Sequence, residues 1–295
     1  MRNKKLVGTG VALVTPFNDD FSVDFESLDN LIDNLIQNGI DYFVIMGTTA
    51  ESATLSENEQ KTILEYVKKK VNGRVPLVFG MGGNDTFDIV NKIKNTDFNG
   101  VEAILSVTPY YNKPSQEGLF HHYELIAKHS PVDILLYNVP SRTSINIQTS
   151  VVVNLAQKHS NIIGIKEASG DINQCMDLIM NCPKNFMIIS GDDKCTFSIL
   201  TLGGVGVISV QAMAFPRLFS NMVNNLLNLR LKEAKNNHYD LLKSVDLFYV
   251  EGNPSGIKEA LYLKGICSSN QVRLPLRPLS KENSNKLKSV LKDTI

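Results

Sequence analysis

Val132-Asp133-Ile134-Leu135-Leu136-Tyr137 is a short, almost wholly apolar run, and Ile162-Ile163-Gly164-Ile165 is a second one farther along the chain. Apolar runs of this length are typical of β-strands that are buried on both faces, as in a parallel sheet. A longer stretch with a helical pattern separates the two runs. Six further runs of the same kind are Val7–Val14, Tyr42–Met46, Val75–Phe79, Val101–Leu105, Phe186–Ile189 and Val205–Ile208.

Amphipathic stretches alternate with these runs. Leu28–Ile36 repeats leucine and isoleucine on one helical face, and Ser56 followed by Glu59 has the spacing of a capping box. About eight strand–helix units within about 210 residues predict an α/β fold, a (β/α)₈ TIM barrel. An open doubly wound sheet is the alternative.

The strand pattern stops after Ala212, and helical patterns follow at 212–228, 231–249, 255–264 and 281–293. The sequence therefore predicts two parts, a catalytic barrel over residues 1–228 and a C-terminal helical extension over residues 229–295.

Composition narrows the function. The 295 residues include 30 basic and 30 acidic side chains, so the chain lacks the basic footprint of a nucleic-acid binder. No apolar run approaches the roughly 20 residues of a membrane span. Leu6–Val14 imitates the apolar part of a signal peptide, but no small-residue cleavage site follows it. We expect a cytoplasmic enzyme with a small-molecule substrate, with no nucleic acid and no membrane as partner.

The cysteines and glycines give no metal or cofactor motif. The four cysteines show neither a C-x-x-C pair nor zinc-ligand spacing, which favours free thiols. Gly80–Gly83 and Gly203–Gly206 lack the full dinucleotide-binding spacing. Gly191-Asp192-Asp193 is interpreted as a helix N-cap with first-turn charge rather than as a metal site. We expect no metal, flavin or pyridoxal phosphate.

Lys166 is the strongest chemical feature of the sequence. It follows the apolar run Ile162–Ile165, and the carboxyl ends of barrel strands carry the active sites of TIM barrels. Burial there disfavours the ammonium form of a lysine, and the neutral amine is a nucleophile for a carbonyl carbon. The alternatives are a solvated strand end, or a lysine paired with Glu167 in a structural role.

Tyr137 and Arg142 follow the preceding strand. Adjacent strands would place Tyr137 within hydrogen-bond reach of Lys166, where a phenol can carry protons during imine chemistry. Arg142 offers a planar fork for a carboxylate. The alternative for the pair is a tyrosine that caps the core and a surface arginine.

Two loops complete the candidate site. Met46–Ser52 contains Gly47, Thr48 and Thr49, whose hydroxyl and backbone N–H groups can hold a carboxylate. Thr108–Pro114 contains Tyr110 and Tyr111, and adjacent exposed aromatic residues mark interfaces. Neither loop is specific by itself, because hydroxyl-rich turns are common.

Taken together, these motifs resemble the dihydrodipicolinate synthase family over nearly the whole chain, in order and at matching spacing. The motifs are Gly47–Ser52, Thr108–Pro114, Tyr137–Thr143, Gly164–Glu167, Ser190–Asp193 and Gly206–Ser209. The resemblance implies a (β/α)₈ barrel with C-terminal helices, assembled as a homotetramer that is a dimer of dimers. It implies a lyase of the diaminopimelate route to lysine, which condenses pyruvate with L-aspartate 4-semialdehyde.

The family pattern also implies residue roles. Lys166 would form the Schiff base with pyruvate, and this covalent imine needs no cofactor. Tyr137, Thr48 and Tyr111 would relay protons, with Tyr111 contributed across a subunit interface. The remaining substrate-binding residues would be Thr49 at the pyruvate carboxylate, Arg142 at the second substrate, and Ile208 and Gly191 along the pocket.

A lysine feedback pocket is a further implication of the resemblance. Ser52, Ala53, Asn84 and Tyr110 match such a pocket, and Asp88 replaces a glutamate. Glu57 and Gln60 stand at positions that often carry histidine, and Ala50 replaces the usual glycine of the hydroxyl loop.

Two other functions stay open. N-acetylneuraminate lyase and the 2-keto-3-deoxy sugar-acid aldolases share the lysine and the tyrosine, but Arg142 and the pair Tyr110-Tyr111 favour the synthase. A non-catalytic barrel that binds a keto acid is the alternative outside enzymes, and the clustered polar residues disfavour it.

Overall fold

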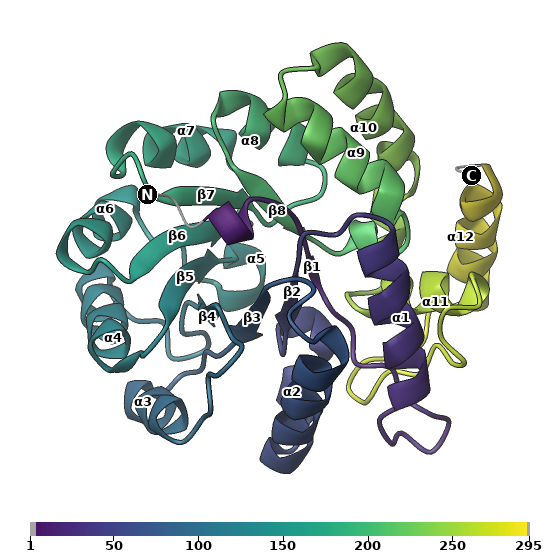
Figure 1. The fold of residues 1–295 in the computed structure, drawn as a ribbon, viewed down its shortest axis with the longest axis horizontal. Coiled ribbons are helices and arrows are strands. Elements are labelled where there is room, and N and C mark those ends of the chain that lie inside the picture. Colours follow the sequence, from purple (N-terminus) through teal and green to yellow (C-terminus); the bar gives the residue numbers. More distant parts are fainter. Residues whose placement is uncertain (1–3, 294–295) are drawn as a thin grey trace. The chain divides into compact units, whose positions relative to one another are not determined.

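The computed structural model describes residues 4–293, and Figure 1 shows them as a barrel of strands with helices. Eight parallel strands follow one another in sequence order around a closed barrel. They are β1 (Gly8–Ala12), β2 (Tyr42–Ile45), β3 (Leu77–Gly80), β4 (Ala103–Val107), β5 (Asp133–Asn138), β6 (Ile162–Glu167), β7 (Met187–Ser190) and β8 (Gly206–Ser209). The predicted (β/α)₈ barrel with C-terminal helices is confirmed.

The later strands extend beyond the apolar runs at their carboxyl ends. Four of them end on a polar residue with at most 1% exposure: Asn138, Glu167, Ser190 and Ser209. The hydropathy pattern stops before these residues because it counts apolar side chains, whereas the backbone ladder continues through polar ones. One consequence is that Lys166 lies within β6, where the sequence predicted it just after the strand.

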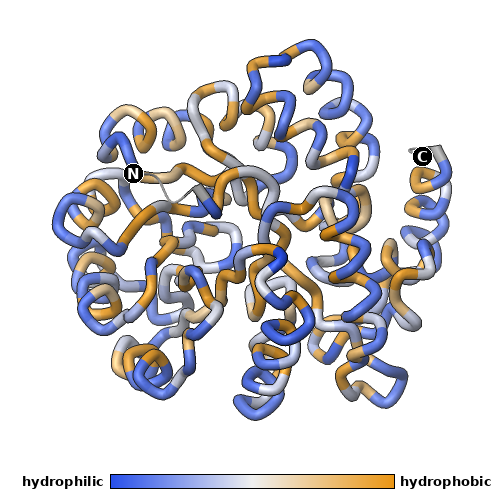
Figure 2. Tube along the Cα trace, viewed as in Figure 1, coloured by the Kyte–Doolittle hydropathy of each residue, from blue (hydrophilic) through white to orange (hydrophobic). Residues whose placement is uncertain are grey.

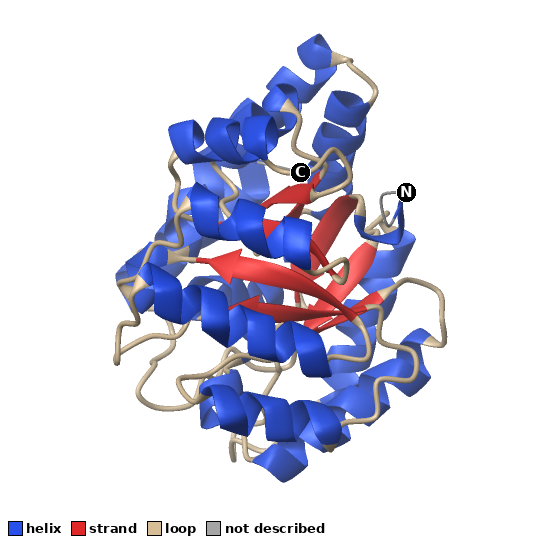
Figure 3. Ribbon diagram, turned by 90° about the vertical axis from the view of Figure 1, so that its left-hand side faces the viewer, coloured by secondary structure: helices blue, strands red, loops and turns tan. Residues whose placement is uncertain are grey.

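Helices separate the strands along the chain as far as β8, and further helices follow the last strand. In chain order the helices are α1 (Phe25–Gln37), α2 (Glu57–Val71), α3 (Thr86–Lys94), α4 (Gln116–His129), α5 (Pro140–Thr143), α6 (Thr149–Lys158), α7 (Ile172–Asn181), α8 (Thr196–Leu202), α9 (Pro216–Leu227), α10 (Leu231–Val245), α11 (Ser255–Leu263) and α12 (Lys281–Asp293). Figure 3 shows the helices in blue and the strands in red, and α6 packs against β6 and α8 against β7. None of the described helices is long and apolar enough to cross a membrane.

Local sequence explains the helix boundaries. Ser56 and Glu59 form the predicted capping box at the start of α2. A single helix was predicted over 212–228, but a 3₁₀ turn at Gln211–Met213 precedes α9, which starts at Pro216 because proline suits the first helical position. The N-cap predicted at Gly191-Asp192-Asp193 is wrong, since Cys195 holds the cap position of α8 and Asp192 accepts the N–H groups of Lys194 and Cys195 in the turn before it.

Two compact units are distinguished by their internal contacts. One comprises Pro76–Ile208 with the segment up to Val7, and the other comprises Gly8–Val75 with Ser209–Ile295. The first unit contains β3 to β8 apart from the last residue of β8, and the second contains β1, β2 and the C-terminal helices. The predicted boundary between residues 228 and 229 falls in the connection from α9 to α10 and stays a prediction.

Within each unit, apolar side chains fill the space between strands and helices. The strands appear mainly orange in Figure 2, and the helices alternate orange and blue along their length. In the first unit Ile134, Leu136 and Ile165 are fully buried, and in the second Val11, Phe43 and Phe248 are. Some of the buried polar side chains, among them Asn138, Glu167 and Ser190, lie at the carboxyl ends of strands, where TIM barrels carry their chemistry.

Candidate active site

Lys166 and Tyr137 are brought together by strand register. The two residues are directly opposite one another on β6 and β5, and they are 6% and 7% exposed. The Lys166 Nζ atom lies over the tyrosine ring, 4.3 Å from its centroid. Their predicted proximity is confirmed, although the amine meets the ring face rather than the hydroxyl. This contact holds the amine by a cation–π interaction and leaves the phenol oxygen available to another group.

Gly191 leaves room for the lysine chain. A Cβ atom at this position would lie 2.9 Å from Lys166 Cε and 2.6 Å from Ala168 Cβ, so any other residue would displace the lysine. The Gly191 N–H donates to the Glu167 carbonyl at 2.7 Å, which continues the ladder between β6 and β7. The structure thus gives Gly191 a steric role beside the Lys166 side chain.

Ile208, the other residue predicted to line the pocket, lies in β8 and is 1% exposed.

Glu167 does not pair with Lys166. Successive strand residues point to opposite faces, so Glu167 points away from the lysine. Its carboxylate accepts hydrogen bonds from Asn138 at 2.9 Å, from Gln174 at 3.0 Å and from the Ser169 N–H at 2.7 Å. Burial raises the pKa of this carboxyl, and the hydrogen bonds oppose that rise.

The amides around Glu167 form a connected network. Asn138 is opposite Glu167 in the strand register, one residue after the pair of Tyr137 and Lys166. Asn138 also donates to Asn146 at 2.7 Å, and Asn146 donates to Gln174 at 2.7 Å. The β5–β6 ends that carry the tyrosine and the lysine are therefore tied together on their opposite face.

Arg142 lies at the carboxyl end of the short helix α5 and is exposed. Among residues 4–293 no carboxylate lies within ion-pair distance of it. Its neighbour Thr143 is buried and donates to the carbonyls of Val139 and Ile145, which anchors the turn. An exposed guanidinium on an anchored turn suits a ligand carboxylate.

Tyr111 is 91% exposed and Tyr110 is 41% exposed. Tyr111 also has a left-handed backbone with a φ of 68°, which a tyrosine rarely adopts. The Asn84 side chain holds the loop by accepting the Tyr110 N–H at 3.2 Å. Within a single chain Tyr111 thus extends into solvent, and its predicted contribution across an interface stays a prediction.

Two residues of the predicted feedback set, Asn84 and Tyr110, are in contact through this bond. Asp88 is exposed in the first turn of α3, where it forms an ion pair with Lys92 at 2.8 Å. Ser52 and Ala53 lie in the 3₁₀ turn Ser52–Thr54 of the other unit. The feedback pocket therefore remains a prediction.

The hydroxyl loop follows β2 and starts with a 3₁₀ turn, Thr48–Ala50. Thr48 is exposed, whereas Thr49 is 3% exposed and its Oγ1 accepts a hydrogen bond from Asn253 Nδ2 at 2.9 Å. Ala50 has a 3₁₀ conformation, which alanine adopts without strain, and its carbonyl accepts from Thr15 at 2.8 Å. The exchange of glycine for alanine is therefore compatible with this backbone.

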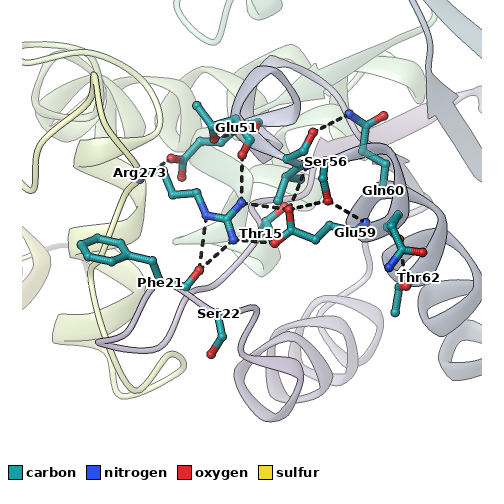
Figure 4. Close-up of polar contacts among 12 residues, drawn as sticks. Thr15, Phe21, Ser22, Glu51, Ser56, Glu59, Gln60, Thr62 and Arg273 are labelled. Carbon is teal, nitrogen blue, oxygen red and sulfur yellow. Dashed lines mark hydrogen bonds and ion pairs between the residues drawn. The ribbon is translucent and has the colours of Figure 1, made fainter.

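A polar cluster encloses the end of this loop, as Figure 4 shows. Glu51 forms an ion pair with Lys258 at 2.6 Å and accepts the Arg273 N–H at 2.8 Å. The Arg273 guanidinium binds Glu59 at 2.6 Å and the Thr54 carbonyl at 2.8 Å. The hydrogen bonds from Arg273 lower the pKa of Glu59 to about 2.

Sequence reasoning missed the supporting residues. Two contacts of the loop join residues about 200 positions apart in the chain. They are the ion pair of Glu51 with Lys258 and the hydrogen bond from Asn253 to Thr49. The sequence around Asn253 is Gly-Asn-Pro, which indicates a constrained loop. It does not indicate which residue Asn253 contacts. Among the described residues no group of three or more histidine, cysteine, aspartate or glutamate side chains could hold a metal ion.

Comparison with known proteins places this geometry in a family. The model of the dihydrodipicolinate synthetase family matches residues 5–294. The chain belongs to this family. The 4-hydroxy-tetrahydrodipicolinate synthase of Flavobacterium psychrophilum is 48% identical over 281 residues, which cover 95% of this chain and 96% of that protein.

Solved structures agree with the family assignment. The chloride-inhibited dihydrodipicolinate synthase of Acinetobacter baumannii, complexed with pyruvate, has a TM-score of 0.94 and 35% identity and covers 98% of this chain and 99% of its own. The enzyme of Cyanidioschyzon merolae with lysine bound has a TM-score of 0.93 and 33% identity and covers 98% of both chains. The resemblance inferred from the motifs is thereby confirmed.

Proposed function

We propose that this protein condenses pyruvate with L-aspartate 4-semialdehyde, as a 4-hydroxy-tetrahydrodipicolinate synthase does, and that it is a lyase of the diaminopimelate route to lysine. The observation that carries the proposal is the buried lysine on the tyrosine ring, at the carboxyl ends of β6 and β5. Membership of the family supplies the substrate class.

The chemistry begins at Lys166. Its Nζ attacks the carbonyl carbon of pyruvate, and loss of water from the carbinolamine leaves an iminium. Loss of a methyl proton gives an enamine, whose carbon forms the new bond to the aldehyde carbon of the second substrate. The amino group of that substrate then attacks the imine carbon, which closes the ring and releases the lysine. One water molecule leaves overall, and the mechanism uses no cofactor or metal.

In this proposal Tyr137 moves protons in the first steps. Its ring holds the amine, and its hydroxyl carries the proton lost and regained as the carbinolamine forms and breaks down. Thr48 and Tyr111 extend the relay, and Thr49 binds the pyruvate carboxylate. Gly191 and Ile208 line the pyruvate pocket, and Arg142 binds the carboxylate of the second substrate.

The relay requires a second copy of the chain. An exposed tyrosine in a strained loop gains a function when a partner subunit covers it, and the Tyr111 loop has both properties. We therefore propose a homotetramer, a dimer of dimers, in which Tyr111 of one subunit completes the site of another. The enzyme would act in the cytoplasm, where both substrates of a biosynthetic route are formed.

Lysine feedback is the finer part of the proposal. The Cyanidioschyzon merolae relative was solved with lysine bound. In this chain Ser52, Ala53, Asn84 and Tyr110 match the feedback pocket that the family resemblance implies, and Asp88 replaces a glutamate of that pocket. Addition of L-lysine at saturating substrate should lower the rate. A rate that stays flat up to millimolar lysine would remove this part of the proposal and leave the catalytic part intact.

Borohydride trapping tests the imine directly. The protein is incubated with pyruvate, reduced with sodium borohydride and digested, and the modified peptide is mapped by mass spectrometry. The label is expected on Lys166 and should disappear in Lys166→Ala, whereas Lys232→Ala, a change at an exposed lysine of α10, should retain it. A label on any other lysine contradicts the proposal.

The second substrate is tested through Arg142. Turnover of pyruvate with L-aspartate 4-semialdehyde is expected in wild type, and Arg142→Ala should reduce kcat/KM for the semialdehyde by about 10² while pyruvate trapping persists. Turnover only with sugar acids would favour an aldolase of the same superfamily. Trapping without turnover on either substrate class would favour a keto-acid-binding barrel.

A further inference from the structure

The ion pair of Glu51 and Lys258 is buried almost completely. Its atoms are 2.6 Å apart, and the two side chains are 1% and 2% exposed. Lys258 Nζ also donates to the Gln271 carbonyl at 2.9 Å and lies 4.0 Å from the centroid of the Phe17 ring. Burial lowers the pKa of this lysine to about 8, although Glu51 opposes that change. Such a pair is weak evidence for added stability, so a positional role is the better explanation.

Glu51 joins two turns of the hydroxyl loop. Its φ of 56° and ψ of 36° are left-handed, and it lies between the 3₁₀ turns Thr48–Ala50 and Ser52–Thr54. A residue other than glycine in this conformation costs about 1–3 kcal/mol and persists only where the surroundings hold it. Lys258 and the Arg273 N–H hold both carboxylate oxygens of Glu51. The direction of the loop therefore depends on α11 and on the segment that follows it.

Asn253 acts on the threonine itself. Its Nδ2 donates to Thr49 Oγ1 at 2.9 Å, and both residues are buried, at 6% and 3% exposure. A hydroxyl oxygen that accepts a bond from an amide directs its own O–H toward a different acceptor. Thr49 is thus prepared as a donor, which is the role that a substrate carboxylate requires.

We propose that the C-terminal helical extension is a positioning element of the pyruvate carboxylate pocket. Asn253 orients the Thr49 hydroxyl as a donor, and the Glu51–Lys258 pair keeps the loop in its turn. These three are positioning residues, since they act on the substrate through Thr49 and its loop. The inference rests on the proposed function, because it assumes that Thr49 binds the carboxylate.

Asn253→Asp tests the hydroxyl directly. A carboxylate in place of the amide accepts the Thr49 proton, so the hydroxyl can no longer donate to the substrate. Loss of one charge-assisted hydrogen bond predicts a fall of about tenfold or more in kcat/KM for pyruvate. The KM for L-aspartate 4-semialdehyde should stay within about twofold of the wild-type value, because the substitution acts on the pyruvate carboxylate. Asn236→Asp, the same change on an exposed face of α10, is the matched control.

Two further variants test the ion pair. Lys258→Met leaves a buried carboxylate without its cation and should reduce kcat/KM for pyruvate about tenfold. Adding Glu51→Gln removes that charge while keeping an acceptor for the Arg273 N–H, so the double variant should recover at least half of the loss on a logarithmic scale. A merely structural pair would change the melting temperature without this selective effect on pyruvate.

The outcomes separate the two proposals. An unlabelled Lys166 in the trapping experiment defeats the proposed function. Labelling of Lys166 together with an unchanged kcat/KM for pyruvate in Asn253→Asp, or an equal loss for both substrates, defeats only the positioning role. If Asn253→Asp does not fold, Asn253→Ala takes its place with an expected loss of about threefold, because it removes the amide donor without adding a charge.

Discussion

Two regions of the molecule hold proposed catalytic groups, and they hold them by different chemistry. The tyrosine and the lysine lie on adjacent strands whose opposite face carries one carboxylate surrounded by amides, namely Glu167 with Asn138 and Gln174. The hydroxyl loop is held instead by a buried ion pair, Glu51 with Lys258. A strand is already fixed by its backbone ladder, whereas a loop with a left-handed residue needs stronger side-chain support.

The comparison indicates where each region is vulnerable. Removing one amide of the network leaves the Glu167 carboxylate with its other hydrogen-bond donors. Removing one member of the ion pair leaves an uncompensated charge in the interior, which is a far larger penalty. Substitutions in the amide network of Glu167 should therefore destabilise the fold less than substitutions in the Glu51–Lys258 ion pair.

The largest expected effect is on the chemistry itself. Tyr137→Phe keeps the ring beneath the amine and removes only the hydroxyl, so the fold should persist while kcat falls by about 10²–10⁴. Steady-state kinetics and a thermal melt measure the two quantities. A variant with more than a tenth of wild-type kcat would show that the proton passes through another group.

Lys258→Met should have the largest effect on stability. Leaving Glu51 buried and unpaired is expected to lower the free energy of unfolding by about 3–5 kcal/mol. Urea denaturation at fixed protein concentration measures this change. The double variant with Glu51→Gln should recover most of it, and equal destabilisation in both variants would mean that packing, not charge, is responsible.

Glu167→Gln is the matching change in the amide network. The carboxylate accepts bonds from three donors, and the glutamine NH₂ group would face one of them, so a loss of about 1–3 kcal/mol is expected. The same urea experiment applies. A loss larger than that of Lys258→Met would reverse the comparison between the two regions.

The smallest effect concerns Glu59 at the partly exposed edge of the loop cluster. The folded-state pKa of Glu59 is about 2, below the ordinary glutamate value of 4.5, so its ionised form stabilises the fold above about pH 4.5. That contribution is lost as the pH falls toward 2. The melting temperature of wild type should exceed that of Glu59→Gln near neutral pH, and the difference should shrink below pH 4.5.

Glu117→Gln is the control for this titration, since Glu117 also lies in the first turn of a helix and is exposed. Its carboxylate also lies near a helix N-terminus, but it has neither the capping box of Glu59 nor a guanidinium partner among the described residues. A difference between wild type and Glu59→Gln that does not change with pH would show that the ion pair with Arg273 does not contribute.

Much of the first region could be predicted from sequence because it depends on local pattern. The apolar runs locate β5 and β6, and adjacency in a barrel then places Tyr137 beside Lys166. The strand ends were predicted too early, since buried polar residues such as Asn138 do not register as apolar. Pattern also could not show that Lys166 meets the ring face of Tyr137, because that depends on rotamers and on the space left by Gly191.

The second region shows the opposite case. The hydroxyl loop could be recognised from Gly47-Thr48-Thr49, but nothing near it in the chain names Lys258 or Asn253 as its support. Glu51 and Lys258 form a buried ion pair, and their burial depends on tertiary packing, which the sequence pattern does not show.

By itself the sequence determined the period and order of the strands and helices and the family, and it predicted Lys166 as the reactive lysine, because all of these depend on composition and spacing along the chain. The tertiary structure decided which distant residues contact the hydroxyl loop. Asn253 and Thr49, and Lys258 and Glu51, are about 200 positions apart, and their contacts depend on how the C-terminal extension packs. Hydrophobic periodicity is a local property of the chain, whereas the pairing of buried polar groups is a property of the folded core.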